Sequence, residues 1–266
     1  MHSIVELEHV HVARGSKIVL HDISLRIAEG EHLAILGPNG CGKSTLLKAI
    51  TCELYPLVRP DTRVRIMGRE RWDLTELRRR MGVVAAELPG KQTLSITGLE
   101  AVLTGFFSSS ILWPNLSITK RMRDRAEEIL ELVNGEALRE MLVGEMSAGQ
   151  QRRVMIGRAM AGTSSNLEEG SVEMLLLDEP SNALDLAAQH DLREMLRGLA
   201  QRGTTILLIT HHIADILPEM DRIVLMRDGR IAADGNKRST LTEPILEELF
   251  GREIAVTERD GYWNAW

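Results

Sequence analysis

The sequence contains few aromatic side chains. Only nine of its 266 residues are phenylalanine, tryptophan or tyrosine, and none of them precedes Tyr55. Six of the nine form two clusters: Phe106, Phe107 and Trp113 in one, and Tyr262, Trp263 and Trp266 in the other. Because 44% of the residues are apolar, the chain can still bury one large core or two modest ones, which excludes an intrinsically disordered protein.

Cysteine and positive charge are also scarce. The two cysteines, Cys41 and Cys52, fit neither a disulfide framework nor a zinc site, so we expect a reducing compartment. The chain has 32 basic and 38 acidic residues, and its formal charge of −6 provides no field that would attract a polyanion. Nucleic acid is therefore not an expected partner.

The sequence has no long apolar run of the kind that spans a membrane. Its longest uncharged stretch, residues 101–119, is apolar at only ten of nineteen positions and contains glycine, proline and serine. The first eight residues carry acidic groups where a secretory signal needs an apolar run. We expect any membrane role to come through a partner.

Four short apolar runs predict strands that are buried on both faces. They cover residues 33–36, 174–177, 205–209 and 223–226, and segments of helical character lie between them. This alternation predicts an α/β fold with a largely parallel sheet.

The middle of the chain has a helical pattern instead. Apolar residues recur at helical spacing from Thr119 to Asn134, with Thr119 as a possible N-cap and Gly135 placed to end the helix. We predict a helical subdomain over residues 91–162, inserted in a core made of residues 1–90 and 163–240 and followed by a tail at 241–266. A surface loop is expected at residues 162–170.

One loop fits the pattern that cradles nucleotide phosphates. It follows the strand predicted at 33–36 and consists of Gly37, Pro38, Asn39, Gly40, Cys41, Gly42, Lys43, Ser44 and Thr45. Its glycines let backbone N–H groups face a polyphosphate, and the next helix adds the positive end of its dipole. Lys43 is expected to reach the β- and γ-phosphates of ATP, and the Ser44 hydroxyl to bind Mg²⁺. The alternative is a glycine turn that arose by chance.

Two adjacent carboxylates, Asp178 and Glu179, follow the strand predicted at 174–177. Ligands in open α/β sheets bind at this end of the strands. Asp178 is suited to hold Mg²⁺ through water, and Glu179 to polarise the water that attacks the γ-phosphate. The alternative is a pair of exposed turn acids before Pro180.

Three further motifs lie at residues 146–150, 181–185 and 210–212. Together with the phosphate loop and the acidic strand, they resemble, in identity and order, the nucleotide-binding domain of ATP-binding cassette (ABC) proteins over about residues 3–235. The resemblance implies a P-loop NTPase core with an N-terminal antiparallel β portion and an inserted helical subdomain.

The resemblance also implies that two copies pair head to tail over two ATP molecules. The signature motif, which would meet the ATP of the partner copy, consists of Ser147, Ala148, Gly149 and Gln150, with alanine where glycine is more usual. Ser147 and Gln150 also have the spacing of a capping box, so Ser147 is expected to begin a helix whose N–H groups bind an anion. An ordinary helix start is the alternative.

Two single residues acquire roles from the same resemblance. Asp185 resembles the residue that links the two ATP sites of the dimer. His211 resembles the histidine that contacts the γ-phosphate and holds Glu179 and the attacking water in place. We expect the neighbouring His212 to point the other way.

Two further departures from the family pattern concern the residues that bind adenine and the metal ion. Most relatives stack an aromatic ring on adenine, but here the equivalent residue is Arg14, whose guanidinium plane can also stack on a base. A solvated hairpin arginine is the alternative. The family's metal-binding glutamine is missing as well. Glu87 is one candidate replacement, because carboxylates bind Mg²⁺ well, and Gln92, further along the chain, is the other.

The first aromatic cluster lies in the uncharged stretch, on the side of the helical subdomain that receives membrane subunits in the family. Phe106, Phe107 and Trp113 are therefore expected either to form a docking surface or to fill the subdomain's own core. The role of the second cluster, Tyr262, Trp263 and Trp266, is left open.

The leading interpretation is the ATP-hydrolysing subunit of an ABC transporter, a peripheral protein on the inner face of the cell membrane with separate permease subunits. The departures at Arg14 and Glu87 resemble a subgroup associated with uptake of molybdate or iron complexes. The alternative is a soluble ABC ATPase that acts as a switch in translation or DNA repair, although one cassette without sustained heptads speaks against it.

Overall fold

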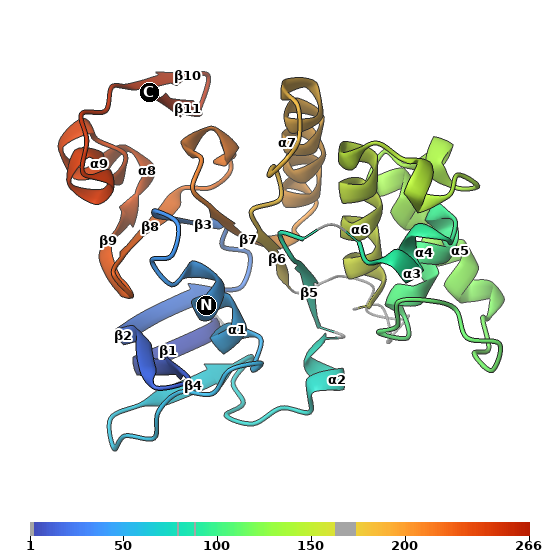
Figure 1. Ribbon diagram of the computed structural model, residues 1–266, viewed down its shortest axis with the longest axis horizontal. Helices are drawn as coiled ribbons and strands as arrows, with labels where there is room; N and C mark the ends of the chain where they lie inside the picture. The colour runs from blue at the N-terminus through green and yellow to red at the C-terminus, as the bar shows by residue number, and fades with distance from the viewer. Residues whose placement is uncertain (1–2, 79, 88, 163–173) are drawn as a thin grey trace. The chain divides into compact units, whose positions relative to one another are not determined.

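The computed structural model describes residues 3–78, 80–87, 89–162 and 174–266 (Figure 1). The chain divides into two units, Met1–Leu74 with Thr205–Trp266 and Thr75–Thr204. Apart from Gly162, the surface loop expected at residues 162–170 lies outside the described residues.

The first unit is rich in β-strands. Its elements are β1 (Ser3–Arg14), β2 (Lys17–Ala28), β3 (Leu33–Leu36), α1 (Lys43–Ile50), β4 (Arg63–Ile66), β7 (Thr205–Thr210), η3 (Ile213–Asp215), β8 (Arg222–Arg227), β9 (Arg230–Asn236), α8 (Lys237–Thr240), α9 (Glu243–Phe250), β10 (Val256–Arg259) and β11 (Tyr262–Ala265). Strands β2, β1 and β4 form an antiparallel sheet in that order. Strand β3 pairs in parallel with β7 on one side and β8 on the other, and β9 adds an antiparallel edge next to β8. The antiparallel N-terminal portion and the largely parallel sheet are both confirmed.

The second unit is mostly helical. Its elements, with α2 beginning one residue before it, are α2 (Leu74–Arg78), β5 (Met81–Val84), α3 (Lys91–Leu94), α4 (Gly98–Gly105), α5 (Lys120–Leu132), η1 (Glu136–Leu138), η2 (Val143–Glu145), α6 (Ala148–Gly162), β6 (Met174–Asp178) and α7 (Leu186–Gln201). Strands β5 and β6 run parallel, and α6 packs against β5, α4, α5 and α7. The finer division into a core, a subdomain at 91–162 and a tail stays a prediction.

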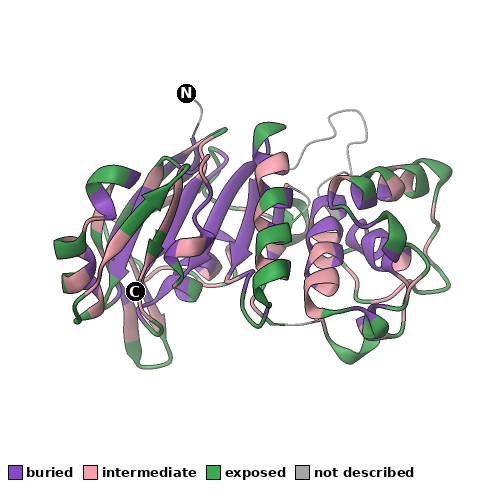
Figure 2. Cartoon of the chain, turned by 90° about the horizontal axis from the view of Figure 1, so that it is seen from above, coloured by how far each residue is buried: buried purple, intermediate pink, exposed green. Residues whose placement is uncertain are grey.

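The four predicted strands are confirmed as β3, β6, β7 and β8, each within one residue at either end. Every residue of β3, β6 and β7 is buried, and Figure 2 shows buried residues in purple. Continuous apolar runs are typical of strands that are covered on both faces, which explains why sequence alone located them so well.

Local signals also fix the ends of the predicted helix. The Thr119 hydroxyl accepts a hydrogen bond from the N–H of Met122, so Thr119 is the N-cap of α5, as predicted. The helix stops at Leu132 because Asn134 adopts a left-handed conformation, with a φ of 51°. The N–H of Gly135 then bonds to the carbonyl of Leu130, at 2.7 Å, which completes a Schellman motif.

The uncharged stretch at 101–119 forms the end of α4 and then turns and irregular chain. Gly105 ends this helix where a side chain would collide with the backbone carbonyl of Arg158 in α6, so glycine lets the two helices approach closely. Within the described part of the chain, no helix combines the length and the apolar character that a membrane crossing requires.

Candidate active site

The phosphate loop joins β3 to α1 in the first unit. The Lys43 ammonium donates hydrogen bonds to the carbonyl oxygens of Gly37, at 2.7 Å, and Pro38, at 3.1 Å. Lys43 is buried although it carries a charge, and it is the first residue of α1. The loop therefore combines a cation with the partial positive charge of a helix N-terminus, an arrangement that favours bound phosphate.

Close backbone packing holds this loop against its neighbours. A side chain at Gly37 would collide with the backbone carbonyl of Met226 in β8, and Gly42 has a φ of 110°. Both positions therefore require glycine. The carbonyl of Cys41 accepts a hydrogen bond from the N–H of Gly229 at 2.8 Å, which ties the loop to the turn between β8 and β9.

These residues fit ATP and Mg²⁺. Asn39, Gly40 and Ser44 are exposed, so the crest of the loop and a hydroxyl at the start of α1 face solvent. A hydroxyl next to a phosphate cradle is an oxygen ligand of the kind that Mg²⁺ prefers when it binds together with a nucleotide.

Cys41 is buried in the loop, and burial raises the pKa of its thiol. Because the thiolate is the reactive form, iodoacetamide should label Cys41 more slowly in the native protein than in the urea-unfolded protein at pH 8. The labelling rate should rise as the pH increases towards the elevated pKa, and ATP should slow labelling further. Mass spectrometry of a Cys52→Ser variant measures this rate at one site, and equal native and unfolded rates would refute the prediction.

His211 follows β7 in a turn that is fixed by a buried pair. The Thr210 hydroxyl donates to the Asp215 carboxylate at 2.6 Å, and the N–H of His212 donates to the same hydroxyl oxygen at 3.0 Å. The prediction that His212 points away from His211 is wrong, because the two ring centroids lie 3.9 Å apart. The chain bends at His211, directly after β7, so the side chains of residues 211 and 212 do not alternate as they do within a strand.

Arg14 lies where the hairpin of β1 and β2 turns. It pairs with Lys17 across a two-residue turn, and Gly15 in that turn has a φ of 61°. The Arg14 side chain is exposed. Its guanidinium is therefore accessible for stacking on a base.

The two acidic residues lie in the second unit, at the end of β6. Asp178 is the last residue of the strand and is only 8% exposed. Glu179 has a φ of 47°, a conformation that is uncommon for residues other than glycine. Such backbone conformations persist only where the surrounding structure holds them in place, and they are found preferentially at functional sites.

The signature motif forms the predicted capping box. The N–H of Gln150 donates to the Ser147 hydroxyl at 3.3 Å, and the N–H of Ser147 donates to the Gln150 side-chain oxygen at 2.9 Å. Helix α6 begins at Ala148, as predicted. A side chain at Gly149 would lie 2.8 Å from the methyl carbon of Ala188, so glycine allows α6 and α7 to pack closely there.

Asp185 has a structural task in the same unit. Its carboxylate accepts a hydrogen bond from the N–H of Ala188 at 2.8 Å and so caps α7. Glu87 is exposed in a bend three residues after β5.

Arg152 is a residue whose importance the sequence did not reveal. Two residues beyond the signature motif, its guanidinium donates to the carbonyls of Ala85 at 2.6 Å and Ala86 at 2.8 Å, and the side chain is almost fully buried. From sequence, the pair Arg152 and Arg153 resembles an ordinary solvated helix face. Arg152 instead connects the signature helix to the segment that precedes Glu87.

Replacing Arg152 with methionine should destabilise the protein by about 2 kcal/mol or more, because two carbonyls lose a charged donor in a part-buried place. The free energy of unfolding in urea measures the loss. Arg153→Met is the matched control, since Arg153 donates to one carbonyl, that of Asn134, at the surface. Equal stability of the two variants would contradict the role assigned to Arg152.

Only part of the proposed docking cluster is at the surface. Phe106 is 7% exposed and belongs to the core of the second unit, so its assignment to a docking surface is wrong. Phe106 is the C-cap of α4. Every residue of this helix except Glu100 is buried, so the Phe106 ring is buried with them. Trp113 is 54% exposed, and Phe107 is half-buried.

Comparisons with known proteins agree with these motifs. The family described as ABC transporter matches residues 20–182. A hemin import ATP-binding protein of Aliivibrio fischeri is 31% identical over 244 residues, covering 91% of this chain and 88% of its own. The zinc transport system ATP-binding protein of Treponema pallidum is 33% identical over 255 residues, covering 95% and 89%. A solved dimeric ATP-binding cassette in a post-hydrolysis state, bound to ADP and Pi, is 28% identical with a TM-score of 0.67 and covers 87% of this chain and 98% of its own.

Proposed function

Since this chain belongs to the ABC transporter family, as an ATP-binding and ATP-hydrolysing subunit, we propose that residues 37–45 bind the phosphates of ATP. The observation that carries this proposal is the Lys43 ammonium, which is buried across the carbonyls of Gly37 and Pro38 at the N-terminus of α1. When a polyphosphate binds, its charged oxygens are stronger hydrogen-bond acceptors for this ammonium than the two neutral carbonyls.

Adenine stacks on Arg14 in this proposal, and Arg14→Ala should raise the dissociation constant of ATP. Ser44 and Asp178 hold Mg²⁺, with Glu87 as a further candidate ligand. The metal ion, when bound, neutralises charge that develops on the phosphate oxygens.

Glu179 acts as the general base and His211 as the group that positions the water. As the water oxygen forms its bond to the γ-phosphorus, the proton passes to the Glu179 carboxylate. The bond from that phosphorus to the bridging oxygen breaks, and ADP leaves with the electron pair. His211 lies in the turn that the hydrogen bond between Thr210 and Asp215 holds together, and this bond supports a positioning role.

A second copy of the chain completes each site. The N-terminus of α6, from Ser147 to Gln150, offers N–H groups to the γ-phosphate held by the partner copy. Asp185 links the two sites. The dimer of the related cassette supports the pairing of two copies, and their head-to-tail arrangement is part of this proposal.

Separate permease subunits bind this protein at the inner face of the membrane, and Trp113 with Phe107 forms the contact. The exposed Trp113 ring offers the apolar area that interface cores use. The named relatives act in hemin import and zinc transport, so we propose a metal ion or a metal complex, such as an iron complex, as the transported substrate. Molybdate is the other candidate from sequence.

The experiment that tests transport is recruitment to membranes. The double variant Phe107→Ser, Trp113→Ser should keep the ATPase activity of the isolated subunit but lose cosedimentation with membranes that contain its permease. Tyr55→Ser is the control, because Tyr55 is an exposed aromatic residue of the other unit. If the double variant still cosediments, the docking contact is wrong. If the unaltered protein copurifies with no membrane protein, the transport role fails. The comparisons give no support to the alternative switch in translation or DNA repair.

A further inference from the structure

The aromatic residues near residue 266 belong to a well-anchored hairpin. Strands β10 and β11 pair around a turn in which Asp260 and Gly261 both have positive φ, 54° and 83°. This turn type matches the twist of the two strands. The hairpin continues through mutual backbone hydrogen bonds between Ala255 and Trp266, at 3.0 and 3.2 Å.

Helix α9 fixes this hairpin in place. The carboxylate of Glu243 accepts from the N–H of Val256 at 3.1 Å, and that of Glu247 accepts from the N–H of Ile254 at 3.4 Å. Strand β11 packs against η3, next to the turn that carries His211. The hairpin is thus held by α9 on one side and by η3 on the other.

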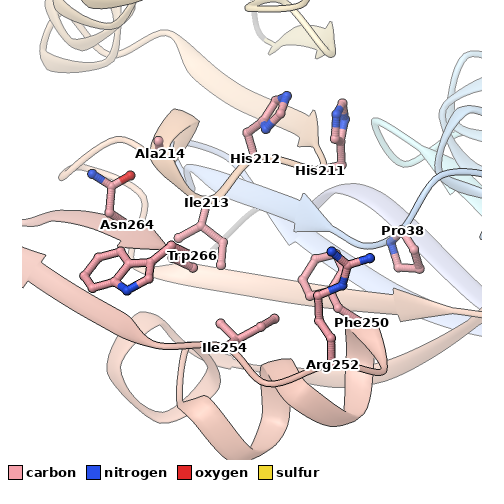
Figure 3. Close-up of a pocket in the computed structure, with 11 residues that line it drawn as sticks. Pro38, His211, His212, Ile213, Ala214, Phe250, Arg252, Ile254, Asn264 and Trp266 are labelled. Carbon is pink, nitrogen blue, oxygen red and sulfur yellow. The ribbon is translucent and has the colours of Figure 1, made fainter.

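A cavity of about 470 Å³ lies between this hairpin, the turn at 211–214 and the phosphate loop (Figure 3). Phe250, Ile254 and Trp266 supply apolar surface, while Arg252 and Asn264 supply polar groups. Its volume lies within the range of sites that bind small molecules. Apolar walls with a few polar groups are also typical of such sites.

The charges of the cavity select an anion. Arg252 supplies a guanidinium, and none of the described residues that line the cavity is aspartate or glutamate. A guanidinium binds carboxylate, sulfonate or phosphate oxygens through two parallel hydrogen bonds. The largely exposed Trp266 ring offers a flat face on which a second ring can stack.

The same cavity reaches two parts of the ATP site. His211 and Pro38 of the phosphate loop both line it. A molecule in the cavity therefore contacts the turn that Thr210 and Asp215 hold together. A ligand that binds one conformation of this turn more tightly than another will increase the population of the conformation that it prefers.

We propose that this cavity binds a small anion with an aromatic ring, through Arg252 and Trp266, and that its occupation changes the rate of ATP hydrolysis through His211. The effect on hydrolysis rests on the proposed function of His211. The binding of the anion does not depend on that function.

Anilinonaphthalene sulfonate, an aromatic anion that fluoresces in apolar sites, is a suitable probe. It should bind the full-length protein at one saturable site and receive excitation energy from tryptophan. Arg252→Gln should weaken binding about tenfold, as expected for loss of a charged hydrogen-bonding partner. Phenylnaphthylamine, the same ring system without the sulfonate, should bind the unaltered protein and Arg252→Gln equally.

Two controls make the result specific. Arg259→Gln removes an exposed arginine of the same hairpin that does not line the cavity, and it should bind the probe like the unaltered protein. Trp266→Phe should keep the ring but reduce energy transfer. Without the probe, Arg252→Gln should hydrolyse ATP at the rate of the unaltered protein. The probe should change the rate of the unaltered protein, and the same probe concentration should leave the rate of Arg252→Gln unchanged.

Equal affinity of Arg252→Gln and the unaltered protein, or no saturable binding, would overturn the site. Normal binding without any effect on hydrolysis would overturn the coupling to His211. If the unaltered protein binds the probe but hydrolyses no ATP, the cavity stands and the proposed function fails.

Discussion

Glu179→Gln is expected to slow ATP hydrolysis by about 10²–10⁴-fold, the contribution of a general base, while ATP binding is kept. Glutamine has nearly the shape of glutamate but cannot accept the proton of the attacking water. The variant also preserves the backbone at this left-handed position at the end of β6. Phosphate release and equilibrium binding of ATP, measured on one preparation, separate the two effects.

The same substitution should also change the association state. A dimer that closes over ATP and cannot hydrolyse it stays closed, so Glu179→Gln with ATP should elute as a dimer in gel filtration. Glu29→Gln, at an exposed turn after β2, is the matched control and should behave like the unaltered protein. Full activity of Glu179→Gln would mean that another group is the base.

Lys43→Ala should raise the dissociation constant of ATP by about tenfold to a hundredfold, the equivalent of one or two strong charged hydrogen bonds. The ammonium is the cation that the structure places over the loop carbonyls of Gly37 and Pro38. The substitution removes the positive charge that would bind the phosphates of ATP. Titration calorimetry with ATP measures the effect directly.

Lys48→Ala provides the comparison for this variant. Lys48 lies in the last turn of the same helix, away from its N-terminus, so its loss should leave ATP binding unchanged. Circular dichroism should confirm that both variants fold. An unchanged dissociation constant for a folded Lys43→Ala would remove the loop from the ATP site.

Sequence patterns predicted the parts of the fold that depend on local chemistry. Continuous apolar runs located β3, β6, β7 and β8, and hydroxyl groups at Thr119 and Ser147 located the first residues of two helices. The capping signals are local, because the side chain of a cap residue accepts a hydrogen bond from an N–H group only three residues away.

Features that depend on contacts between distant segments could not be predicted in the same way. The burial of Phe106 depends on how α4 packs, and the role of Arg152 depends on carbonyls more than sixty residues earlier in the chain. The cavity beside Trp266 needs the hairpin, η3 and the phosphate loop together. A count of aromatic residues finds the cluster at 262–266, but it does not show that Trp266 alone of the three lines a cavity.

The central claim is that two copies of this chain bind and hydrolyse ATP together. The most direct measurement is the rate of phosphate release from ATP with Mg²⁺ as a function of protein concentration. The rate per chain should rise with concentration and then level off, because each ATP site needs the signature helix of a second copy. A rate per chain that is constant over the whole range would contradict the shared sites, and no phosphate release at any concentration would contradict the account as a whole.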